Sequence, residues 1–299
     1  NHVMYVWDDA LTNYLTGLGF PDDTENMRDF WPANLHLIGK DIVRFHTIYW
    51  PAFLMSADLP LPKQVFGHGF LLARGGEKMS KSAGNVVDPL ELAETFGVDN
   101  LRYFLLREVA FGQDGSYSPE AIVTRTNAEL ANSFGNLAQR TLSMIAKNMD
   151  GALEAFEPND ADAQLLDIVH KACAEELPKE FNKLAFSNGI EAWIKAVYAC
   201  NQYVDEQAPW ALKKTDPERM KIVLQTLFCA IRDLAIAIQP VVPDKAAAVL
   251  DMVGVAPNER TYAALTDTTW FDRLVASEFM LAKPTPVFPR LELPEDEAA

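Results

Sequence analysis

The sequence predicts an α/β portion followed by an all-α portion within its 299 residues. Short β-like runs alternate with helical stretches over roughly the first hundred residues. After Ser118, apolar residues recur at helical spacing in long amphipathic segments. A third observation is a set of helix starts, each marked by a capping side chain and a proline. A mixed region followed by a run of helices indicates two structural parts.

In the first part, short apolar runs are expected as strands at Val3–Trp7, Leu35–Ile38 and Val65–Leu72. A helix is expected to begin near Lys40, and the segment Pro21–Ala33 is expected to be a long loop.

Helix starts are well marked in the rest of the chain. Asp88, Ser118 and Asp216 each stand directly before a proline, which suits the first position of a helix. Gly97 is a natural helix stop. The prolines at positions 284, 286 and 289 indicate a tail that returns toward the body of the protein.

Composition sets outer limits on the function. A hydrophobic content of 49% excludes global disorder, and no apolar run is long enough to cross a membrane, so a cytoplasmic protein is expected. The net charge of −16 argues against indiscriminate nucleic-acid binding, and neither DNA nor a membrane is an expected partner. Cys173, Cys200 and Cys229 are far apart, which favours buried free thiols over a disulfide or a zinc site. No metal site is expected.

The segment from Gly75 to Asn85 combines glycines, two lysines and two hydroxyl side chains after an apolar run. Such a loop can close over a triphosphate and stabilise the charge that develops on departing pyrophosphate. A solvated surface turn has a similar composition, but the order Lys-Met-Ser-Lys-Ser favours the phosphate-binding interpretation.

A second candidate site lies around position 40. Ile42, His46 and Trp50 recur at four-residue spacing on one helical stripe, with Asp41 at the helix start. The aromatic residues between Tyr5 and Tyr14 provide a second wall for an apolar pocket. The alternative is an ordinary core with a buried, satisfied histidine.

A third candidate site lies in the helical part. Asn136 and Arg140 are one helical turn apart, and Trp210 follows Pro209 at the end of a later helix. An amide, a guanidinium and a flat ring can bond and stack an unpaired base. The alternative is a surface charge and a residue that packs at the end of a helix.

Four blocks occur in the order typical of one family: Tyr-Val-Trp with Asp-Ala, Ile-Gly-Lys-Asp-Ile-Val with Phe-His and Trp-Pro, Gly-His-Gly-Phe, and Lys-Met-Ser-Lys-Ser. In these blocks the sequence resembles the methionyl-tRNA synthetases of class I, and the resemblance continues nearly to the last residue. It implies a Rossmann-like catalytic portion followed by an all-α anticodon-binding bundle.

The resemblance implies roles for individual residues. The implied methionine-binding residues are Trp7, Ala10, Leu11, Tyr14, Asp41, Ile42, His46 and Trp50, with Asp41 on the α-amino group. The implied ATP-binding residues are His68, Gly69, Lys78, Met79, Ser80, Lys81 and Val86, of which Lys78 and Lys81 are catalytic. The implied anticodon-binding residues are Asn136, Arg140 and Trp210.

The resemblance also implies methionine–tRNA ligase activity with L-methionine, ATP with Mg²⁺, and tRNA(Met), including the initiator, as ligands. The expected parts are 1–87 (second half of the catalytic domain), 88–117 (helical connection) and 118–299 (anticodon-binding domain).

The sequence departs from the family pattern in three respects. It contains no His-Ile-Gly-His-type motif and no zinc-binding cysteines of a connective peptide, so it looks like the carboxy-terminal part of a longer enzyme. Asp8 stands where the family usually has an apolar residue. An inactive tRNA-binding module is the alternative function, whereas the cysteine or isoleucine enzymes fit Trp210 and the stripe of His46 and Trp50 less well.

Overall fold

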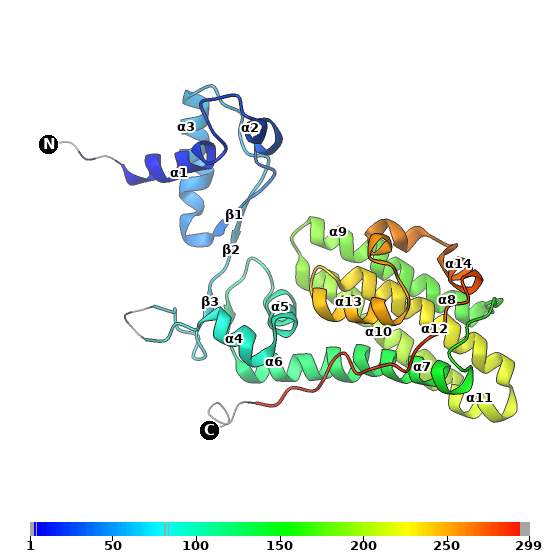
Figure 1. Cartoon of the computed structure of the whole chain (residues 1–299). Coiled ribbons are helices and arrows are strands. Elements are labelled where there is room, and N and C mark those ends of the chain that lie inside the picture. The colour runs from blue at the N-terminus through cyan, green and yellow to red at the C-terminus, as the bar shows by residue number, and fades with distance from the viewer. Residues whose placement is uncertain (1–2, 4, 81, 83, 294–299) are drawn as a thin grey trace. The chain divides into compact units, whose positions relative to one another are not determined.

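The computed structural model describes residues 3, 5–80, 82 and 84–293. The chain divides into two compact units. The first comprises positions 1–78 and 111–116, and the second comprises 79–110 and 117–299. The α-helices of both units and strands β1, β2 and β3 are labelled in Figure 1.

Over its described residues, the first unit contains three α-helices and four short strands. Its elements are α1 (Val6–Thr16), α2 (Glu25–Phe30), β1 (His36–Gly39), the 3₁₀ turn η1 (Lys40–Ile42), the π-helical segment η2 (Phe45–Tyr49), α3 (Trp50–Ser56), β2 (Val65–His68), β3 (Leu71–Leu72) and β4 (Gly115–Ser116). Strands β1 and β2 are parallel, with His36 opposite Val65, and β3 pairs in parallel with β4.

The core of the first unit lies between α1 and α3 and is rich in aromatic residues. Leu11 and Leu15 from α1 are buried together with Trp31, Trp50 and Leu54. Leu11 and Leu15 are four residues apart, so α1 presents one apolar stripe to α3.

Two expectations for this unit are wrong. Val3–Trp7 is not a strand, because α1 begins at Val6 and Val3 and Tyr5 lie outside any strand. The helical spacing of Trp7, Leu11 and Leu15 outweighs the strand preference of the aromatic residues. Asp8 is exposed in the first turn of this helix, where a carboxylate is favourable.

The second wrong expectation is the continuous loop Pro21–Ala33, because it contains α2. The Thr24 side chain caps α2 by accepting a hydrogen bond from the Met27 N–H at 3.1 Å. The expected strand Val65–Leu72 is divided into β2 and β3 by Gly69 and Phe70, whereas the helical start near Lys40 is confirmed.

The second unit is helical apart from its loops and the returning tail. Its elements are α4 (Pro89–Phe96), α5 (Val98–Arg107), α6 (Pro119–Arg125), the π-helical segment η4 (Thr126–Gly135), α7 (Asn136–Asn148), α8 (Asp160–His170), the π-helical segment η5 (Lys171–Glu176), α9 (Leu177–Asn182), α10 (Phe186–Gln207), α11 (Pro209–Thr215), α12 (Pro217–Ile238), α13 (Pro243–Met252), the 3₁₀ turns η6 (Pro257–Glu259) and η7 (Tyr262–Thr266), and α14 (Trp270–Ala276).

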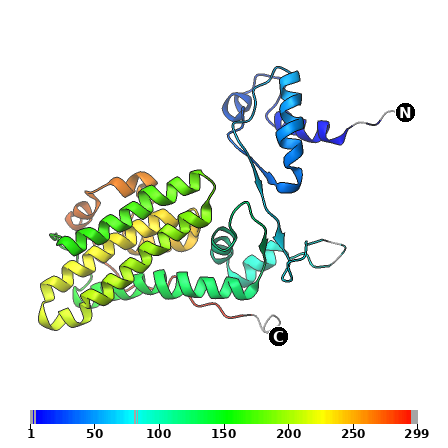
Figure 2. The ribbon, with the colours of Figure 1, turned by 180° about the vertical axis from the view of Figure 1, so that it is seen from behind.

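The helices of this unit pack around α12, which contacts α7, α8, α10, α11 and α13. Leu227, Phe228 and Ile231 of α12 are fully buried, with Trp193 and Val197 of α10 in the same core. Figures 1 and 2 show the bundle from opposite sides.

The sequence markers of the helix boundaries are confirmed. The Asp88 side chain accepts a hydrogen bond from the Leu90 N–H at 2.7 Å, and Asp216 accepts one from the Arg219 N–H at 3.0 Å. Ser118 likewise caps α6, and Gly97 ends α4 with a φ of 84°.

The returning tail is also confirmed. Asn127 exchanges two hydrogen bonds with the backbone of Leu291, at 2.9 and 2.8 Å. Phe288 is buried against Phe134, with ring centroids 5.7 Å apart. The tail lies along the helical run of α6, η4 and α7 (Figure 1).

The three cysteines are free, with Cys173 and Cys200 buried and Cys229 partly buried. Among the described residues, we find no helix that combines the length and the apolar character required to span a membrane.

Candidate functional site

The aromatic cluster of the first unit is arranged around His46, whose ring contacts those of Trp7, Tyr14 and His36. Nδ1 of His46 lies 3.0 Å from the Ile42 carbonyl oxygen, and its Nε2 lies 2.9 Å from the Tyr14 hydroxyl. A carbonyl oxygen only accepts, so Nδ1 carries the proton. In the neutral ring, Nε2 therefore accepts from the hydroxyl of Tyr14. This chain of contacts orients both side chains, and burial raises the pKa of the Tyr14 hydroxyl.

A second imidazole, that of His36, belongs to this cluster. The indole N–H of Trp50 donates to Nε2 of His36 at 3.2 Å, and both residues are buried. The Tyr14 ring lies 4.4 Å from the His36 ring. Burial, with a smaller contribution from the charge of His46, lowers the pKa of His36. His36 is therefore a neutral member of the cluster that accepts one hydrogen bond.

Trp7 forms the outer wall. Its ring stacks on Phe45 at a centroid distance of 4.0 Å and an interplanar angle of 9°, and it lies 6.3 Å from the His46 ring. The π-helical segment η2, which contains both Phe45 and His46, is a local departure of the kind often found at functional sites. The structure thus brings together Trp7, Tyr14, His46 and Trp50, with Leu11 in the core beneath them.

The remaining predicted pocket residues are more accessible. Ala10 and Asp41 are exposed, and Ile42 is half-buried. Asp41 has no side-chain hydrogen bond or ion pair with the described residues, so its carboxylate can accept a ligand ammonium.

The Gly-His-Gly-Phe block lies where β2 ends. His68 Nδ1 is 2.8 Å from the Gly69 carbonyl oxygen, and the His68 ring stacks loosely on Phe111, with centroids 6.2 Å apart. A Cβ on Gly69 would lie 2.0 Å from the Gln113 carbonyl oxygen. Glycine is therefore required at position 69 by a close approach of two backbone segments.

Lys78 follows a tight turn after β3. The Gly76 N–H donates to the Ala73 carbonyl oxygen, and the Ala73 N–H to that of Glu77, both at 2.8 Å. The Lys78 ammonium lies 4.4 Å from the centroid of the Phe70 ring. The turn thus holds the first lysine of the segment against an aromatic face.

The same ring carries a second ammonium. Lys40 lies 4.9 Å from the Phe70 centroid and pairs with Asp114, its Nζ 2.6 and 2.7 Å from the carboxylate oxygens. Asp114 also accepts from the Phe70 N–H at 2.8 Å. The hydrogen bond from Lys40, helped by that from Phe70, lowers the pKa of Asp114.

The rest of the lysine segment belongs to the second unit. The Ser80 N–H donates to the Asn85 side chain at 2.9 Å, and Met79 packs against the apolar cluster of Phe96 and Phe104. Val86 is exposed. Lys81, predicted to be the second catalytic lysine, lies outside the described residues.

In the helical unit, the structure brings Arg140 and Trp210 together. The Arg140 guanidinium lies 5.5 Å from the Trp210 ring centroid, and 48% of Trp210 is exposed. Asn136 is exposed one turn before Arg140 on α7. Neither Asn136 nor Arg140 has a side-chain hydrogen bond to any residue that the structure describes. An open stacking face thus lies beside polar groups with spare donors and acceptors.

Two further cations lie on the helix that bears Trp210. Lys213 and Lys214 are exposed in the last turn of α11. They are two cationic side chains close in sequence to Trp210, on a chain with a net charge of −16. Sequence reasoning overlooked them, although a Lys-Lys pair just after Trp210 was a visible signal.

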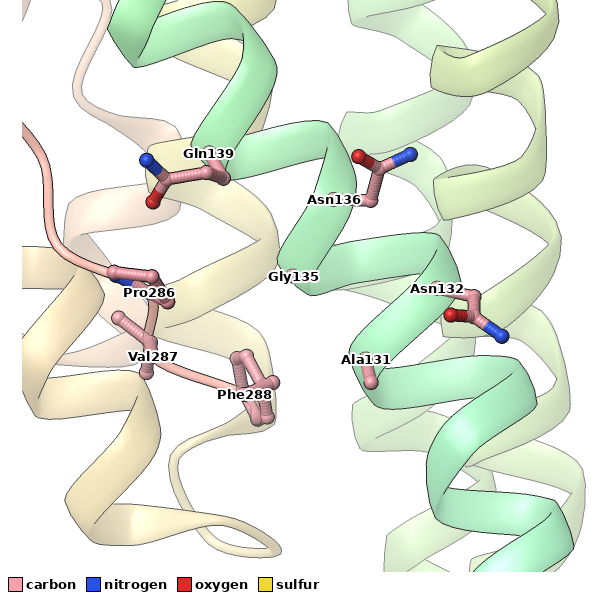
Figure 3. Close-up of a pocket in the computed structure, with 8 residues that line it drawn as sticks. All are labelled: Ala131, Asn132, Gly135, Asn136, Gln139, Pro286, Val287 and Phe288. Atoms are coloured by element: carbon pink, nitrogen blue, oxygen red, sulfur yellow. The ribbon is translucent and has the colours of Figure 1, made fainter. Parts of the chain in front are cut away.

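A hollow of about 350 Å³ lies between α7 and the tail. Figure 3 shows its lining, which consists of Ala131, Asn132, Gly135, Asn136, Gln139, Pro286, Val287 and Phe288. The side chains of Asn132 and Asn136 point away from the tail, whereas Gln139 points toward it (Figure 3). Asn136 therefore lines the hollow, whereas Arg140 and Trp210, the other two base-binding candidates, are not among its lining residues.

Among the residues that the structure describes, no group of three or more His, Cys, Asp or Glu side chains is placed to hold a metal ion.

Comparisons with known proteins agree with these features. Residues 1–142 match the family described as tRNA synthetases class I (M), and residues 153–292 match the anticodon binding domain of methionyl tRNA ligase. The methionine–tRNA ligases of Brucella suis and Mycobacterium tuberculosis are both 53% identical to the chain, over 97% and 99% of its length. The chain belongs to the methionyl-tRNA synthetases.

Solved structures of methionyl-tRNA synthetase give the same result for the fold. The M. tuberculosis enzyme bound by methionyl-adenylate matches with a TM-score of 0.87 at 51% identity, covering 96% of this chain and 56% of that one. Its free form matches with a TM-score of 0.86 at 49% identity, covering 98% and 57%. The fold is therefore a class I methionyl-tRNA synthetase catalytic portion followed by a helical anticodon-binding domain.

The chain spans about half the length of the curated relatives it matches, namely 55% of the Brucella enzyme and 56% of the Mycobacterium enzyme.

Several residues around the methionyl-tRNA synthetase pocket were not predicted. His36, Phe45 and Phe70 contact predicted site residues, and Asp114 contacts Phe70. Phe45 and Phe70 lie within the quoted motif blocks but were given no role, whereas His36 and Asp114 lie outside those blocks. His36 was the easiest to find, because a histidine within an apolar run at a strand is unusual and needs a polar partner.

Proposed function

We propose that this chain contributes the methionine pocket, part of the ATP site and the anticodon-binding bundle of a methionine–tRNA ligase. In the first step, a carboxylate oxygen of methionine attacks the α-phosphorus of ATP. The bond from that phosphorus to the bridging oxygen breaks and pyrophosphate leaves. In the second step, a hydroxyl of the terminal ribose of tRNA(Met), elongator or initiator, attacks the methionyl carbonyl and AMP leaves.

The chain's residues contribute positioning and electrostatics, because the methionine carboxylate is itself the nucleophile. Lys78 and Lys81 stabilise the negative charge that develops on pyrophosphate. His68, Gly69, Met79, Ser80 and Val86 contact the nucleotide. Mg²⁺ enters with ATP and is held by its phosphates.

The methionine pocket accounts for the amino-acid substrate. Trp7, Leu11 and Trp50 enclose a flexible apolar side chain, and sulfur–aromatic contacts favour a thioether by about 0.3–1.5 kcal/mol. The Tyr14 hydroxyl donates a hydrogen bond to His46, so its oxygen remains able to accept one from a ligand. Asp41 pairs with the α-ammonium, with Ala10 and Ile42 at the pocket edge.

The bundle accounts for the RNA. Trp210 stacks one base of the CAU anticodon, and Asn136 and Arg140 bond base edges. Lys213 and Lys214 attract the adjacent phosphates.

The observation that carries this proposal is the chain of hydrogen bonds from Tyr14 through buried His46 to the Ile42 carbonyl. It orients a hydroxyl group beside the aromatic cluster of a chain that is 51% identical to a protein solved with methionyl-adenylate. The test is binding of L-methionine to the purified chain, measured by isothermal titration calorimetry with L-leucine as the control amino acid. Tighter binding of methionine than of leucine is expected.

The alternative, an RNA-binding module without activity, makes a different prediction in the same experiment. The chain would then bind an RNA hairpin with a CAU loop but bind methionine no better than leucine. Both functions are compatible with an exposed Trp210 beside Arg140, so RNA binding does not discriminate between them. The comparison of methionine with leucine does.

A further inference from the structure

The stacking residue Trp210 follows a strained corner of the chain. Helix α10 ends at Gln207, Ala208 adopts the left-handed conformation with φ 45° and ψ 58°, and α11 begins at Pro209. A left-handed conformation costs a residue other than glycine about 1–2 kcal/mol. Such a corner persists only where surrounding contacts hold it.

A buried ion pair lies beside this corner. Asp162 of α8 is fully buried, and the guanidinium of Arg219, in the first turn of α12, donates to its two oxygens at 2.5 and 2.6 Å. The Tyr203 hydroxyl donates to the same carboxylate. Burial alone would raise the pKa of Asp162, but the hydrogen bonds from Arg219 and Tyr203 lower it overall. The carboxylate is therefore ionised and fixed at neutral pH.

Gln207 connects the ion pair to the corner. Nη2 of Arg219 donates to Oε1 of Gln207 at 2.8 Å, and Gln207 is the last residue of α10 before Ala208. The contacts thus run from α8 through the first turn of α12 to the end of α10. Helix α11 joins α10 to α12 at this end of the bundle (Figure 1).

We propose that Asp162, Arg219 and Gln207 are positioning residues that fix the corner before Trp210 and so hold its ring in place for base stacking. This rests on the proposed RNA-binding function. None of the three residues needs to touch RNA, because each acts through the orientation of the Trp210 ring.

Replacing Gln207 tests the positioning role without disturbing the contribution of the ion pair to the stability of the bundle. The pair between Asp162 and Arg219 has two hydrogen bonds of its own and Tyr203 as a further donor, so it persists when Gln207 is replaced. Loss of the Gln207 acceptor removes the link to the corner alone.

The first experiment measures the Trp210 ring without RNA. The chain is labelled with 5-fluorotryptophan, and Trp210 is assigned among its six tryptophans with Trp210→Phe. Gln207→Met keeps the length of the side chain and removes the acceptor. Gln202→Met is the matched control, because Gln202 lies on the same helix and, among the described residues, its side chain bonds only to exposed Glu206.

We expect Gln207→Met to shift the Trp210 fluorine resonance toward that of a solvent-exposed tryptophan, while the other five resonances and the melting temperature stay unchanged. Gln202→Met should shift none of them. Gln207→Glu restores an acceptor for Arg219 and should return the Trp210 resonance close to its original position. An unchanged Trp210 resonance in Gln207→Met overturns the proposal.

The second experiment measures the dissociation constants of two RNA hairpins from the chain. One hairpin has a CAU loop, and in the other the first base of that loop is changed. Gln207→Met should weaken CAU binding about 3- to 10-fold and reduce the discrimination between hairpins, because a misplaced ring loses part of the stacking energy. Equal CAU binding by Gln207→Met and the unsubstituted chain would refute the role in stacking.

The two possible failures are distinguishable. If the unsubstituted chain does not discriminate between the hairpins, the proposed anticodon function fails, and with it the role of the three residues in RNA binding. The fluorine measurement still decides whether they hold the ring.

Discussion

At the scale of single residues, the aromatic pocket depends on one hydroxyl group. The Tyr14 hydroxyl is the partner of Nε2 of His46, and His46 is only 2% exposed. A buried nitrogen without a partner costs about 1–3 kcal/mol, so the effect of removing the hydroxyl should exceed that of losing one surface hydrogen bond.

Tyr14→Phe should therefore weaken L-methionine binding about 5- to 50-fold, as measured by isothermal titration calorimetry, and should lower the stability of the first unit. Tyr49→Phe is the matched control, because Tyr49 belongs to the same unit and its hydroxyl has no hydrogen bond to the described residues. Equal methionine affinities for the two variants would contradict the role of the Tyr14 hydroxyl.

Trp210 is the corresponding residue in the bundle. Trp210→Ala removes a stacking surface worth about 1–3 kcal/mol per base, so it should weaken binding of the CAU hairpin by roughly 5- to 150-fold. Trp210→Phe should retain much of the affinity. Methionine-dependent pyrophosphate exchange in the complete enzyme should be unaffected by Trp210→Ala, and parallel loss of both activities would refute a role confined to RNA.

At the scale of the elements, the positions of the glycines show which backbone segments are crowded. Gly69 lies between β2 and β3, where an added Cβ would meet the Gln113 backbone at 2.0 Å. Gly75, in the turn that follows β3, has no atom closer than 4.0 Å to an added Cβ. Steric crowding therefore requires glycine at position 69 but not at position 75.

Gly69→Ala should destabilise the first unit by about 1–3 kcal/mol, because the backbone must move to admit the methyl group. Gly75→Ala should change its stability by less than about 1 kcal/mol. Urea titrations followed by the fluorine signals of labelled Trp7, Trp31 and Trp50 report on this unit alone. Equal midpoints for the two variants would show that the close approach is not constraining.

The element boundaries were predictable where a local signal dominates. The caps at Asp88, Ser118 and Asp216 are confirmed because each depends on a side chain bonding backbone groups two or three residues away. The expected strand at Val3–Trp7 is wrong because the packing of Leu11 and Leu15 against α3 favours a helix more than aromatic composition favours a strand.

At the scale of the whole molecule, the helical unit contains an acidic group that is costly to ionise. The side chain of Asp233 is 17% exposed and pairs with Arg232 at 2.7 Å. Burial raises its pKa to about 6, despite the opposing effect of Arg232. The unfolded chain releases this proton near pH 4, so between about pH 4 and 6 the folded state binds more protons. This group's contribution to stability therefore falls as pH rises through that window.

Asp233→Asn cannot ionise and keeps an acceptor for Arg232. The variant should be about as stable as the unsubstituted chain near pH 4 and more stable by about 1–3 kcal/mol at pH 7.5, measured by urea denaturation. Asp167→Asn, at an exposed position of α8, is the control and should give no pH-dependent difference. A gain for Asp233→Asn that is equal at both pH values would rule out ionisation as its cause.

The sequence by itself determined the family, the order of an α/β portion and a helical bundle, and the candidate residues, because these depend on local periodicity, caps and motif order. Only the tertiary structure decided that Tyr14 and His36 meet His46 and Trp50, that Arg140 lies against Trp210, and that Asp162 and Arg219 reach Gln207. These partners are far apart along the chain, and the packing of helices and strands that brings them together is a collective property without a local signal.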